Sequence, residues 1–327
     1  MRFVIYGAGA VGGTIGGRLF QAGHDVTLVA RGDHLAALQR NGLTLASPEG
    51  TATLPVPAVG TPAEAGLAEG DVVVLAMKTQ HTAAALADLA LAAPPGIRVV
   101  CAQNGVENER LALRSFADVY GMVIMMPATH LEPGVVEVWS APVSGLLDLG
   151  CFPVGVDDTS RAIAAALSDA RFSAEAMPDI MRWKYRKLLL NLGNAIEVVA
   201  GETDRSDPAR ARLAARLVEE GEAVLAAAGI PVATAEEEAE RRGDLLRIRP
   251  IDGRRRQGGS SWQSVARGLG TVESDYLNGE ITLLGRLHGV PTPTNDLLQR
   301  LARRLAAEGR PPGAYGIDEV VAALEPG

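Results

Sequence analysis

The feature that most constrains this chain is a set of three glycines that directly follows an apolar β-type run at the N-terminus. Gly7, Gly9 and Gly12 stand at G-x-G-x-x-G spacing. Such a loop needs glycine for a tight turn, for close approach of the backbone to a pyrophosphate, and for close packing of a helix on a strand. A glycine-rich helical pattern over 11–22 and a second apolar strand over 25–30 follow. This strand–turn–helix–strand order predicts a dinucleotide-binding unit.

The predicted contacts come from the loop and the start of the helix. The pyrophosphate would lie on the N–H groups of a helix that begins near Ala10. The residues expected to contact the nucleotide are Gly7, Ala8, Gly9, Ala10, Val11 and Gly12.

The end of the second strand distinguishes NAD from NADP. Units that prefer NAD usually carry an acidic residue there, which accepts hydrogen bonds from the ribose. This chain has Ala30 and then Arg31. A guanidinium holds a 2′-phosphate through paired charge-assisted hydrogen bonds, whereas a carboxylate repels it. We therefore expect NADP as the cofactor. The alternative is that Arg31 is a solvated loop charge and that nearby Asp33 binds the ribose.

Length and composition exclude several classes of protein. A chain of 327 residues is long enough for two domains, and a net charge of −8 argues against a nucleic-acid partner. Cys101 and Cys151 are too few and too far apart for a disulfide framework or a metal cluster, so we expect no metal and a reducing compartment. No stretch approaches the ~20 apolar residues that cross a bilayer, and the N-terminus lacks signal-peptide features. We expect a cytoplasmic protein with no membrane partner.

The two halves of the chain differ in pattern. The first alternates β-rich runs at 71–77 and 97–102 with a helical pattern at 82–93, which is typical of a doubly wound parallel sheet. Strands broken by glycine and proline, over 119–126 and 135–149, suit the far edge of that sheet. From about residue 174 long helical patterns dominate, at 179–199, 208–228, 236–242, 276–288 and 297–308.

We therefore predict an α/β protein in which an N-terminal Rossmann-type doubly wound sheet, residues 1–178, is followed by an all-helical C-terminal domain, residues 179–327. Helices with an apolar face, such as 212–227, allow two arrangements. They can pair two chains in a homodimer or pack within one chain.

Polar residues that a core does not need follow two of the predicted strands. Lys78 follows the strand at 71–77, and Asn104 follows the strand at 97–102. Ligands bind at the carboxyl ends of strands in open α/β sheets, so both side chains could contact the nicotinamide ribose or a substrate carboxylate. Ordinary loop polarity is the alternative for either residue alone.

The helical pattern at 179–199 carries Lys187, Asn191 and Asn194 at i, i+4 and i+7. In one continuous helix these three lie within about 60° of each other, among leucines. A desolvated lysine has a lowered pKa, which suits a proton donor, and amides can orient a polar substrate. The alternative is that Lys187 is exposed. Lys184 and Arg186 are competing basic residues, and both can equally be surface residues.

Two further segments carry polar groups suited to a substrate. The Gly-Gly-Ser-Ser run that ends at Ser261 offers backbone N–H groups and hydroxyls, which can bind a carboxylate. Glu273 begins a helical pattern, where either helix capping or catalysis accounts for its carboxylate. Spacing does not separate these two roles.

With these residues in order, the chain resembles the ketopantoate reductase family (2-dehydropantoate 2-reductase) over nearly its whole length. No single motif carries the resemblance; the ordered set does. It comprises Gly7, Gly9 and Gly12 with Arg31, then Lys78, Asn104-Gly105, the helix bearing Trp183, Lys187 and Asn191, the pair Ser260-Ser261, residues 273–279 and residues 289–295.

The resemblance implies NADPH-dependent reduction of a 2-keto acid to a 2-hydroxy acid, with ketopantoate to pantoate in pantothenate biosynthesis as the first substrate to test. It also implies roles for individual residues. Lys187 would be the general acid, and Glu273 would contact the substrate hydroxyl or orient the lysine. Asn104 and Ser261 would hold the carboxylate, Asn191 the distal hydroxyl, and Lys78 would lie beside the nicotinamide and the substrate. Lys78, Asn104 and Glu273 would also border the cofactor.

The sequence departs from the family at several of these places. The family's second helix asparagine falls at Ala195 here, and Asn194 stands one residue earlier as the candidate substrate contact. Trp262 replaces a usual methionine, and the role of His130 is open between a substrate contact and a structural histidine. These departures bear on which 2-keto acid is reduced. The competing hypotheses are the same chemistry on another 2-keto acid and a non-catalytic NADP(H)-binding sensor.

Overall fold

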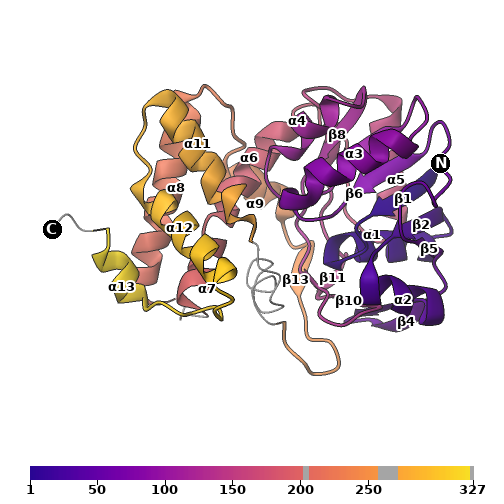
Figure 1. Cartoon of the computed structure of the whole chain (residues 1–327), viewed down its shortest axis with the longest axis horizontal. Coiled ribbons are helices and arrows are strands. Elements are labelled where there is room, and N and C mark those ends of the chain that lie inside the picture. Colours follow the sequence, from indigo (N-terminus) through magenta and orange to yellow (C-terminus); the bar gives the residue numbers. More distant parts are fainter. Residues whose placement is uncertain (202–205, 257–271, 325–327) are drawn as a thin grey trace. The chain divides into compact units, whose positions relative to one another are not determined.

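The computed structural model describes residues 1–201, 206–256 and 272–324 (Figure 1). Ser261, a predicted substrate contact, and Trp262, whose role is open, lie outside these ranges. The chain divides into two compact units. Unit 1 contains residues 1–184 and 235–256, and unit 2 contains residues 185–234 and 257–327. Unit 1 is an α/β unit and the described part of unit 2 is helical, which confirms the predicted fold class.

The main sheet of unit 1 is doubly wound. Among the described residues it has seven strands in the order β12-β8-β7-β6-β1-β2-β5. Neighbouring strands are parallel, except that β12 is antiparallel to β8. The strand bounds are β1 Arg2–Tyr6, β2 Asp25–Val29, β5 Ala58–Val59, β6 Val72–Leu75, β7 Arg98–Cys101, β8 Asp118–Met122 and β12 Leu149–Cys151. The strand order reverses between β1 and β6, which is where open α/β sheets bind ligands.

Helices cover both faces of this sheet. On one face α1 (Ala10–Gln21) and α5 (Asp158–Asp169) pack on apolar side chains that include Ile5, Leu28 and Leu149. On the other face α3 (Thr82–Ala92) and α4 (Asn108–Leu113) pack on a cluster that includes Val73 and Val99. Alternate residues of one strand point to opposite faces, so the near-continuous apolar strands supply both cores. Residues 1–178 also form α2 (Gly32–Asn41) and the 3₁₀ turn η1 (Thr79–His81).

A second sheet corrects one sequence expectation. Residues 135–138 do not join the far edge of the main sheet. They form β10 (Val135–Val138), which pairs in parallel with β3 (Leu43–Ser47) and antiparallel with β9 (Ala128–Thr129). With β4 (Gly50–Leu54) these strands form a four-stranded sheet in the order β4-β3-β10-β9. Alternation predicts a strand here but not its partner, and the pairing of β10 with β3 joins residues about 90 positions apart.

Helix α1 lies between the two sheets. A Cβ added at Gly16 would meet Leu28 of the main sheet at 2.6 Å, and one added at Gly17 would meet Leu45 of the second sheet at 2.8 Å. A glycine inside a helix costs about 0.5–1 kcal/mol relative to alanine. In α1 the glycines allow both sheets to approach the helix closely, because no side chain separates them. The glycine-rich composition of α1 therefore follows from packing as well as from nucleotide binding.

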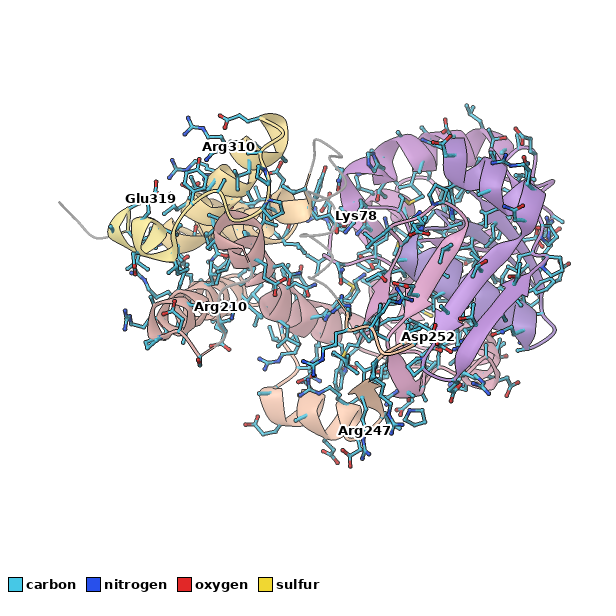
Figure 2. The ribbon with its side chains drawn as sticks, turned by 90° about the horizontal axis from the view of Figure 1, so that it is seen from below. Lys78, Arg210, Arg247, Asp252, Arg310 and Glu319 are labelled. Atoms are coloured by element: carbon cyan, nitrogen blue, oxygen red, sulfur yellow. The ribbon has the colours of Figure 1, made fainter. Side chains whose placement is uncertain are left out.

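A segment from late in the chain completes unit 1. It contains α9 (Ala235–Arg242) and β13 (Leu246–Ile248), and β13 pairs antiparallel with β11 (Ser140–Pro142). Arg247 and Asp252 mark this segment in Figure 2. Arg241 ties α9 to the sheet by an ion pair with Asp148 at 2.6 Å. The short strand β13 therefore lies in the half of the sequence expected to be all-helical, but it belongs to the α/β unit.

One expected helix, which begins at the end of the first segment of unit 1 and continues into unit 2, is broken at residues 192–193. The pattern over 179–199 becomes α6 (Ile180–Asn191) and α7 (Asn194–Ala200), separated by Leu192 and Gly193. The other described elements of unit 2 are α8 (Pro208–Ala227), the 3₁₀ turn η2 (Glu273–Asp275), α11 (Asn278–His288), α12 (Pro293–Ala307) and α13 (Ile317–Ala322). None of the helices built from described residues is both long and apolar enough to cross a membrane.

A buried polar network holds the end of α6 in unit 2. Asn278 donates from Nδ2 to the carbonyl of Leu192 at 3.1 Å and to Oδ1 of Asn295 at 3.0 Å. Asn295 donates in turn to Oε2 of Glu220 at 2.8 Å. Glu220 also accepts the backbone N–H groups of Thr294 and Asn295, so it caps the N-terminal turn of α12. Asn278 and Asn295 are at most 1% exposed, and each unmet bond there would carry a desolvation cost.

We predict that Asn278→Asp lowers the free energy of unfolding by about 2–4 kcal/mol. The change keeps the size of the side chain, removes both N–H donors and places a carboxylate against two oxygen acceptors. Urea denaturation at neutral pH measures the effect. Glu222→Gln, on the exposed side of α8 in the same unit, is the control and should change stability by less than about 0.5 kcal/mol. Equal effects of the two changes would contradict the network.

Candidate active site

The glycine loop has the geometry that its spacing predicts. Gly7 follows β1 with φ +103°, and a Cβ there would meet the backbone N of Met77 at 2.8 Å. A Cβ on Gly12 would overlap the carbonyl of Gly7 and meet Ile5 and Ala76 at 2.9 Å each. At Gly9, by contrast, the nearest atom to an added Cβ is the His130 ring at 3.9 Å. Two of the glycines therefore permit chain packing, and Gly9 leaves space beside the loop.

The N-terminus of α1 suits an anion. Its N-cap is Gly9, no side chain caps it, and its first turn contains no acidic residue. The first N–H groups of a helix lack acceptors within the helix and carry about half a positive charge, so they bind a phosphate well. The loop therefore fits a dinucleotide pyrophosphate: its backbone supplies donors, and Gly9 leaves room for close approach.

Arg31 lies at the expected strand end. It directly follows β2 and Ala30, it is the N-cap residue of α2, and its side chain is 69% exposed. The guanidinium donates to the hydroxyl of Tyr6 at 3.2 Å and lies 3.6 Å from Asp88. An ion pair this exposed contributes at most about 1 kcal/mol, so the guanidinium can turn to a bound phosphate at little cost. Asp33, the alternative ribose contact, lies exposed in the first turn of α2.

Lys78 and Asn104 lie at adjacent strand ends, as predicted. Residue pairing places Leu75 of β6 beside Tyr6 of β1 and Cys101 of β7, so all three strands end at the same edge. Hydrogen bonds join the two loops: Gln103 donates to the Met77 carbonyl at 2.9 Å, and Thr79 donates to the Asn104 carbonyl at 3.3 Å. The predicted nucleotide loop, Lys78 and Asn104 are thus brought together in unit 1, where Figure 2 marks Lys78.

Two histidines stand beside the glycine loop. The rings of His34 and His130 pack with centroids 4.3 Å apart. His34 accepts the N–H of Gly134 at Nδ1, so its Nε2 carries the proton and donates to the carbonyl of Ala8 at 2.7 Å. His130 donates from Nδ1 to the carbonyl of Val135 at 2.9 Å. These bonds give both rings a structural role, holding the loop and the second sheet together.

The predicted catalytic and substrate-binding residues of unit 2 that the structure describes lie on three elements, α6, α7 and η2. Lys187 and Asn191 share α6, one turn apart; Lys187 is half-buried and Asn191 is 6% exposed. Asn194 does not share that helix, because the chain breaks at Gly193 and Asn194 starts α7. The expectation of one continuous face for all three is therefore wrong. Glu273 is 4% exposed in η2, so its carboxylate is not a solvated surface charge.

The sequence leaves Lys184 as either a competing basic residue or a surface residue. The structure shows that it is buried in unit 1. It is 3% exposed and forms an ion pair with Glu109, which is fully buried. Lys184 also donates to the carbonyl of Gln103 at 3.0 Å, one residue before Asn104. Burial raises the pKa of the Glu109 carboxyl, and the Lys184 charge acts against that rise. The pair thus fixes the first turns of α6 against the loop that presents Asn104.

The scarcity of lysine in the chain marks Lys184 as unusual. The chain has 31 basic residues, and only Lys78, Lys184 and Lys187 are lysines. Arginine serves almost everywhere that a positive charge is required. Lysine remains where a compact ammonium or a titratable amine differs from a guanidinium. Within the described parts of the chain, no group of three or more His, Cys, Asp or Glu side chains is arranged to hold a metal ion.

Comparisons with known proteins agree with this arrangement. The profile of the family described as "Ketopantoate reductase PanE/ApbA" matches residues 3–153, and that of "Ketopantoate reductase PanE/ApbA C terminal" matches residues 179–306. A "2-dehydropantoate 2-reductase" of Pyrococcus horikoshii is 30% identical over 308 residues, covering 93% of this chain and 97% of the relative.

Solved structures extend the likeness to the fold. A PanE/ApbA family ketopantoate reductase from Ralstonia eutropha JMP134 superposes with a TM-score of 0.79 at 28% identity, covering 94% of this chain and 99% of the other. A D-mandelate dehydrogenase bound to NADH and anilino(oxo)acetate has a TM-score of 0.80 at 23% identity and the same coverage, which indicates a shared fold. From the two family profiles and a relative matched along almost its entire length, the chain belongs to the ketopantoate reductase PanE/ApbA family.

Proposed function

We propose that the protein is an NADPH-dependent reductase that converts a 2-keto acid to a 2-hydroxy acid, with 2-dehydropantoate to pantoate, a step of pantothenate biosynthesis, as its reaction. One observation carries the proposal. The uncapped N-terminus of α1 lies at the strand-order reversal, beside the loops of Lys78 and Asn104. The relative from Pyrococcus horikoshii, named for this reaction, supports the choice of substrate. We assign residues 1–178 to cofactor binding and 179–327 to substrate binding and catalysis.

The cofactor contacts follow from unit 1. Gly7, Ala8, Gly9, Ala10, Val11 and Gly12 form the pyrophosphate loop. Arg31 binds the 2′-phosphate of NADPH with an exposed guanidinium, which in the described chain donates to the Tyr6 hydroxyl and forms an exposed ion pair with Asp88. Lys78 and Asn104 border the nicotinamide end, at the neighbouring strand ends, and Glu273 completes the cofactor contacts.

The chemistry requires a proton as well as a hydride. When bound, the nicotinamide of NADPH supplies a hydride to the keto carbon. Lys187 donates a proton to the keto oxygen, which becomes the hydroxyl of the product, and the lysine is left neutral until it takes a proton from water. Glu273 contacts that hydroxyl or orients Lys187, and a carboxylate near the lysine favours its charged form.

The substrate is held by polar groups of both halves of the sequence. Asn104 and Ser261 bind the carboxylate, and Lys78 lies beside it. Asn191 binds the distal hydroxyl, and Asn194 serves as a second amide. The break at Gly193 gives Asn194 a different helix from Asn191, so the two amides need not contact the same substrate atom.

The test of the proposed reaction is NADPH oxidation with a panel of 2-keto acids: 2-dehydropantoate, 2-oxoisovalerate, pyruvate and phenylglyoxylate. The proposal expects the highest kcat/KM for 2-dehydropantoate. A clearly higher kcat/KM for another member of the panel would keep the chemistry and replace the substrate. Tight NADPH binding with no oxidation by any member would favour the sensor hypothesis instead.

Lys187→Ala is expected to lower kcat by about 10²- to 10⁴-fold, because that is the usual contribution of a positioned general acid. The dissociation constant for NADPH should stay within a factor of about 3, since Lys187 is not one of the cofactor contacts. Steady-state kinetics and fluorescence titration of NADPH measure the two quantities. Lys187→Arg is the matched variant: it keeps the charge but cannot release a proton near neutrality, so kcat should stay low. A variant with nearly full kcat would remove Lys187 as the acid.

Arg31→Ala is expected to weaken NADPH binding by about 10- to 100-fold, the equivalent of one charge-assisted hydrogen-bonded pair, and to leave NADH binding nearly unchanged. Titration of both reduced cofactors on wild type and variant provides the comparison. Asp33→Asn serves as the control for the alternative ribose contact. If Asp33→Asn weakens NADH while Arg31→Ala weakens both cofactors equally, the preference for NADP is wrong.

Assembly and location are further parts of the proposal. The apolar side of α8, including Leu213, Leu217 and Val224, is buried, and α8 packs on α11 and α12 within unit 2. That face is therefore occupied within one chain, and a homodimer would need another surface. Light scattering of the purified protein measures whether it is a dimer.

We place the enzyme in the cytoplasm, where Cys101 and Cys151, both free thiols, stay reduced.

A further inference from the structure

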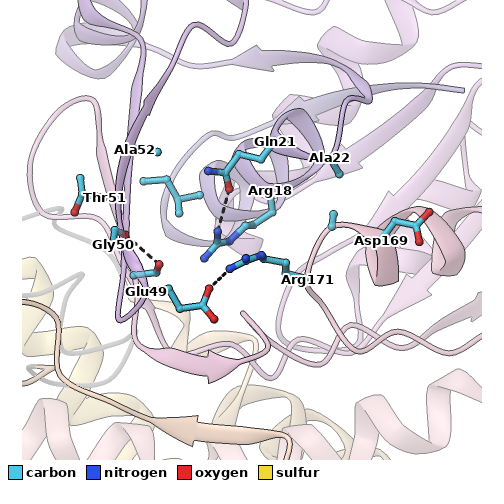
Figure 3. Close-up of a pocket in the computed structure, with 12 residues that line it drawn as sticks. Arg18, Gln21, Ala22, Glu49, Gly50, Thr51, Ala52, Asp169 and Arg171 are labelled. Carbon is cyan, nitrogen blue, oxygen red and sulfur yellow. Dashed lines mark hydrogen bonds and ion pairs between the residues drawn. The ribbon is translucent and has the colours of Figure 1, made fainter.

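A pocket in unit 1 lies away from the nucleotide loop. It has a volume of about 400 Å³ and is formed by the last turn of α1, the β3–β4 hairpin and the end of α5 (Figure 3). Its lining residues with charged or amide side chains are Arg18, Gln21, Glu49, Asp169 and Arg171. Pockets of about 300–1,000 Å³ are typical of small-molecule sites.

Arg18 is a buried charge whose hydrogen-bond partners are neutral. Its residue is 6% exposed, Nε donates to the hydroxyl of Ser144 at 2.9 Å, and Nη1 donates to the amide oxygen of Gln21 at 2.9 Å. No carboxylate of the described chain forms an ion pair with it. Burial, and then the charge of Arg171, lower the pKa of Arg18 to about 10, so it remains charged at neutral pH. A buried charge without a counter-charge is costly, and proteins usually pair it.

Arg171 places a second guanidinium at the same pocket. Its backbone has φ +66°, a conformation uncommon for a residue other than glycine, and its carbonyl accepts the N–H of Ser144 at 2.8 Å. Ser144 therefore holds both arginines, through its side chain and its backbone. The guanidinium of Arg171 pairs with Glu49, and both side chains are about half exposed.

The local negative charge does not balance these two arginines. Glu49 pairs with Arg171 only, and Asp169 is exposed and points away from both guanidinium groups (Figure 3). The C-terminal end of α1 contributes roughly half a negative charge, which offsets part of the charge of Arg18. A positive excess therefore remains at Arg18.

We propose that this pocket binds a small molecule through a carboxylate or phosphate group held by Arg18 and Arg171. Planar guanidinium groups bind both oxyanions through paired hydrogen bonds. Arg18 is eight residues beyond Ala10 on α1, which is about 12 Å along the helix axis. The pocket and the pyrophosphate loop thus lie at opposite ends of one helix, and the ligand does not compete with the cofactor.

Calorimetric titration with two probes tests the proposal: inorganic phosphate for the phosphate class and succinate for the carboxylate class. Each is titrated into the full chain with and without saturating NADP⁺. Wild type should bind one of the probes with the same affinity in both conditions, because the site is separate from the cofactor. The probe that binds identifies the oxyanion class. Binding that NADP⁺ abolishes would assign the probe to the nucleotide loop and overturn the proposal.

Three variants locate the binding. Arg18→Gln should weaken the probe by at least 10-fold and Arg171→Gln by a smaller factor, whereas Glu49→Gln should strengthen it by releasing Arg171. Arg161→Gln, on the exposed side of α5 and outside the lining, is the control and should bind as wild type does. If Arg18→Gln does not fold, the opposite shifts of Arg171→Gln and Glu49→Gln still decide. No binding by wild type at millimolar probe, or equal binding by all variants, would overturn the site.

Discussion

The approach of α1 to the main sheet at Gly12 is the contact on which unit 1 depends. A side chain there would overlap the carbonyl of Gly7 and press on Ile5 and Ala76, so the helix rests directly on β1 and on the loop after β6. That approach fixes where the first N–H groups of α1 lie: beyond the end of β1, at the reversal of strand order. The second sheet then packs on the far side of the helix. The position of the nucleotide loop thus depends on the absence of side chains at Gly12 and at Gly7.

The local sequence pattern predicted most strands and helices of this structure. It did not predict which strands pair when the partners are far apart in the sequence. The strands at 2–6, 25–29, 72–75 and 98–101 are apolar runs bounded by turn residues, and their order implies the doubly wound sheet. The pairing of β10 with β3 and the return of residues 235–256 to unit 1 involve partners roughly 90 or more positions away. Periodicity contains no information about such partners.

The residues of the candidate site also divide into those that local sequence pattern places and those that depend on packing between distant segments. Lys78 and Asn104 could be placed because each follows a strand directly, and the sheet geometry carries both to one edge. A shared face for Lys187, Asn191 and Asn194 could not be predicted correctly, because the prediction assumed an unbroken helix across Gly193. Lys184 and Glu109 are 75 positions apart, and their pairing depends on the packing of α6 against the loop after β7. Sequence spacing gives no measure of that packing, although the scarcity of lysine in the chain marks Lys184 as unusual.

The break between α6 and α7 explains Asn278 and Asn295, two polar residues of the segments 273–279 and 289–295 to which the family resemblance assigns no role. Where α6 stops at Asn191, the carbonyl of the buried Leu192 accepts a 3.4 Å bond from the N–H of Ala195 in place of a regular helical bond. Asn278, from the segment 273–279, adds a donor at 3.1 Å, and Asn295, from the segment 289–295, accepts a bond from Asn278. The same short segment carries Glu273 in η2, five residues before Asn278. The hydrogen bond that satisfies a broken helix thereby also ties the helix of Lys187 to the turn of Glu273 within unit 2. Polar residues that look dispensable to the chemistry are thus required to keep its candidate acid and carboxylate on connected elements.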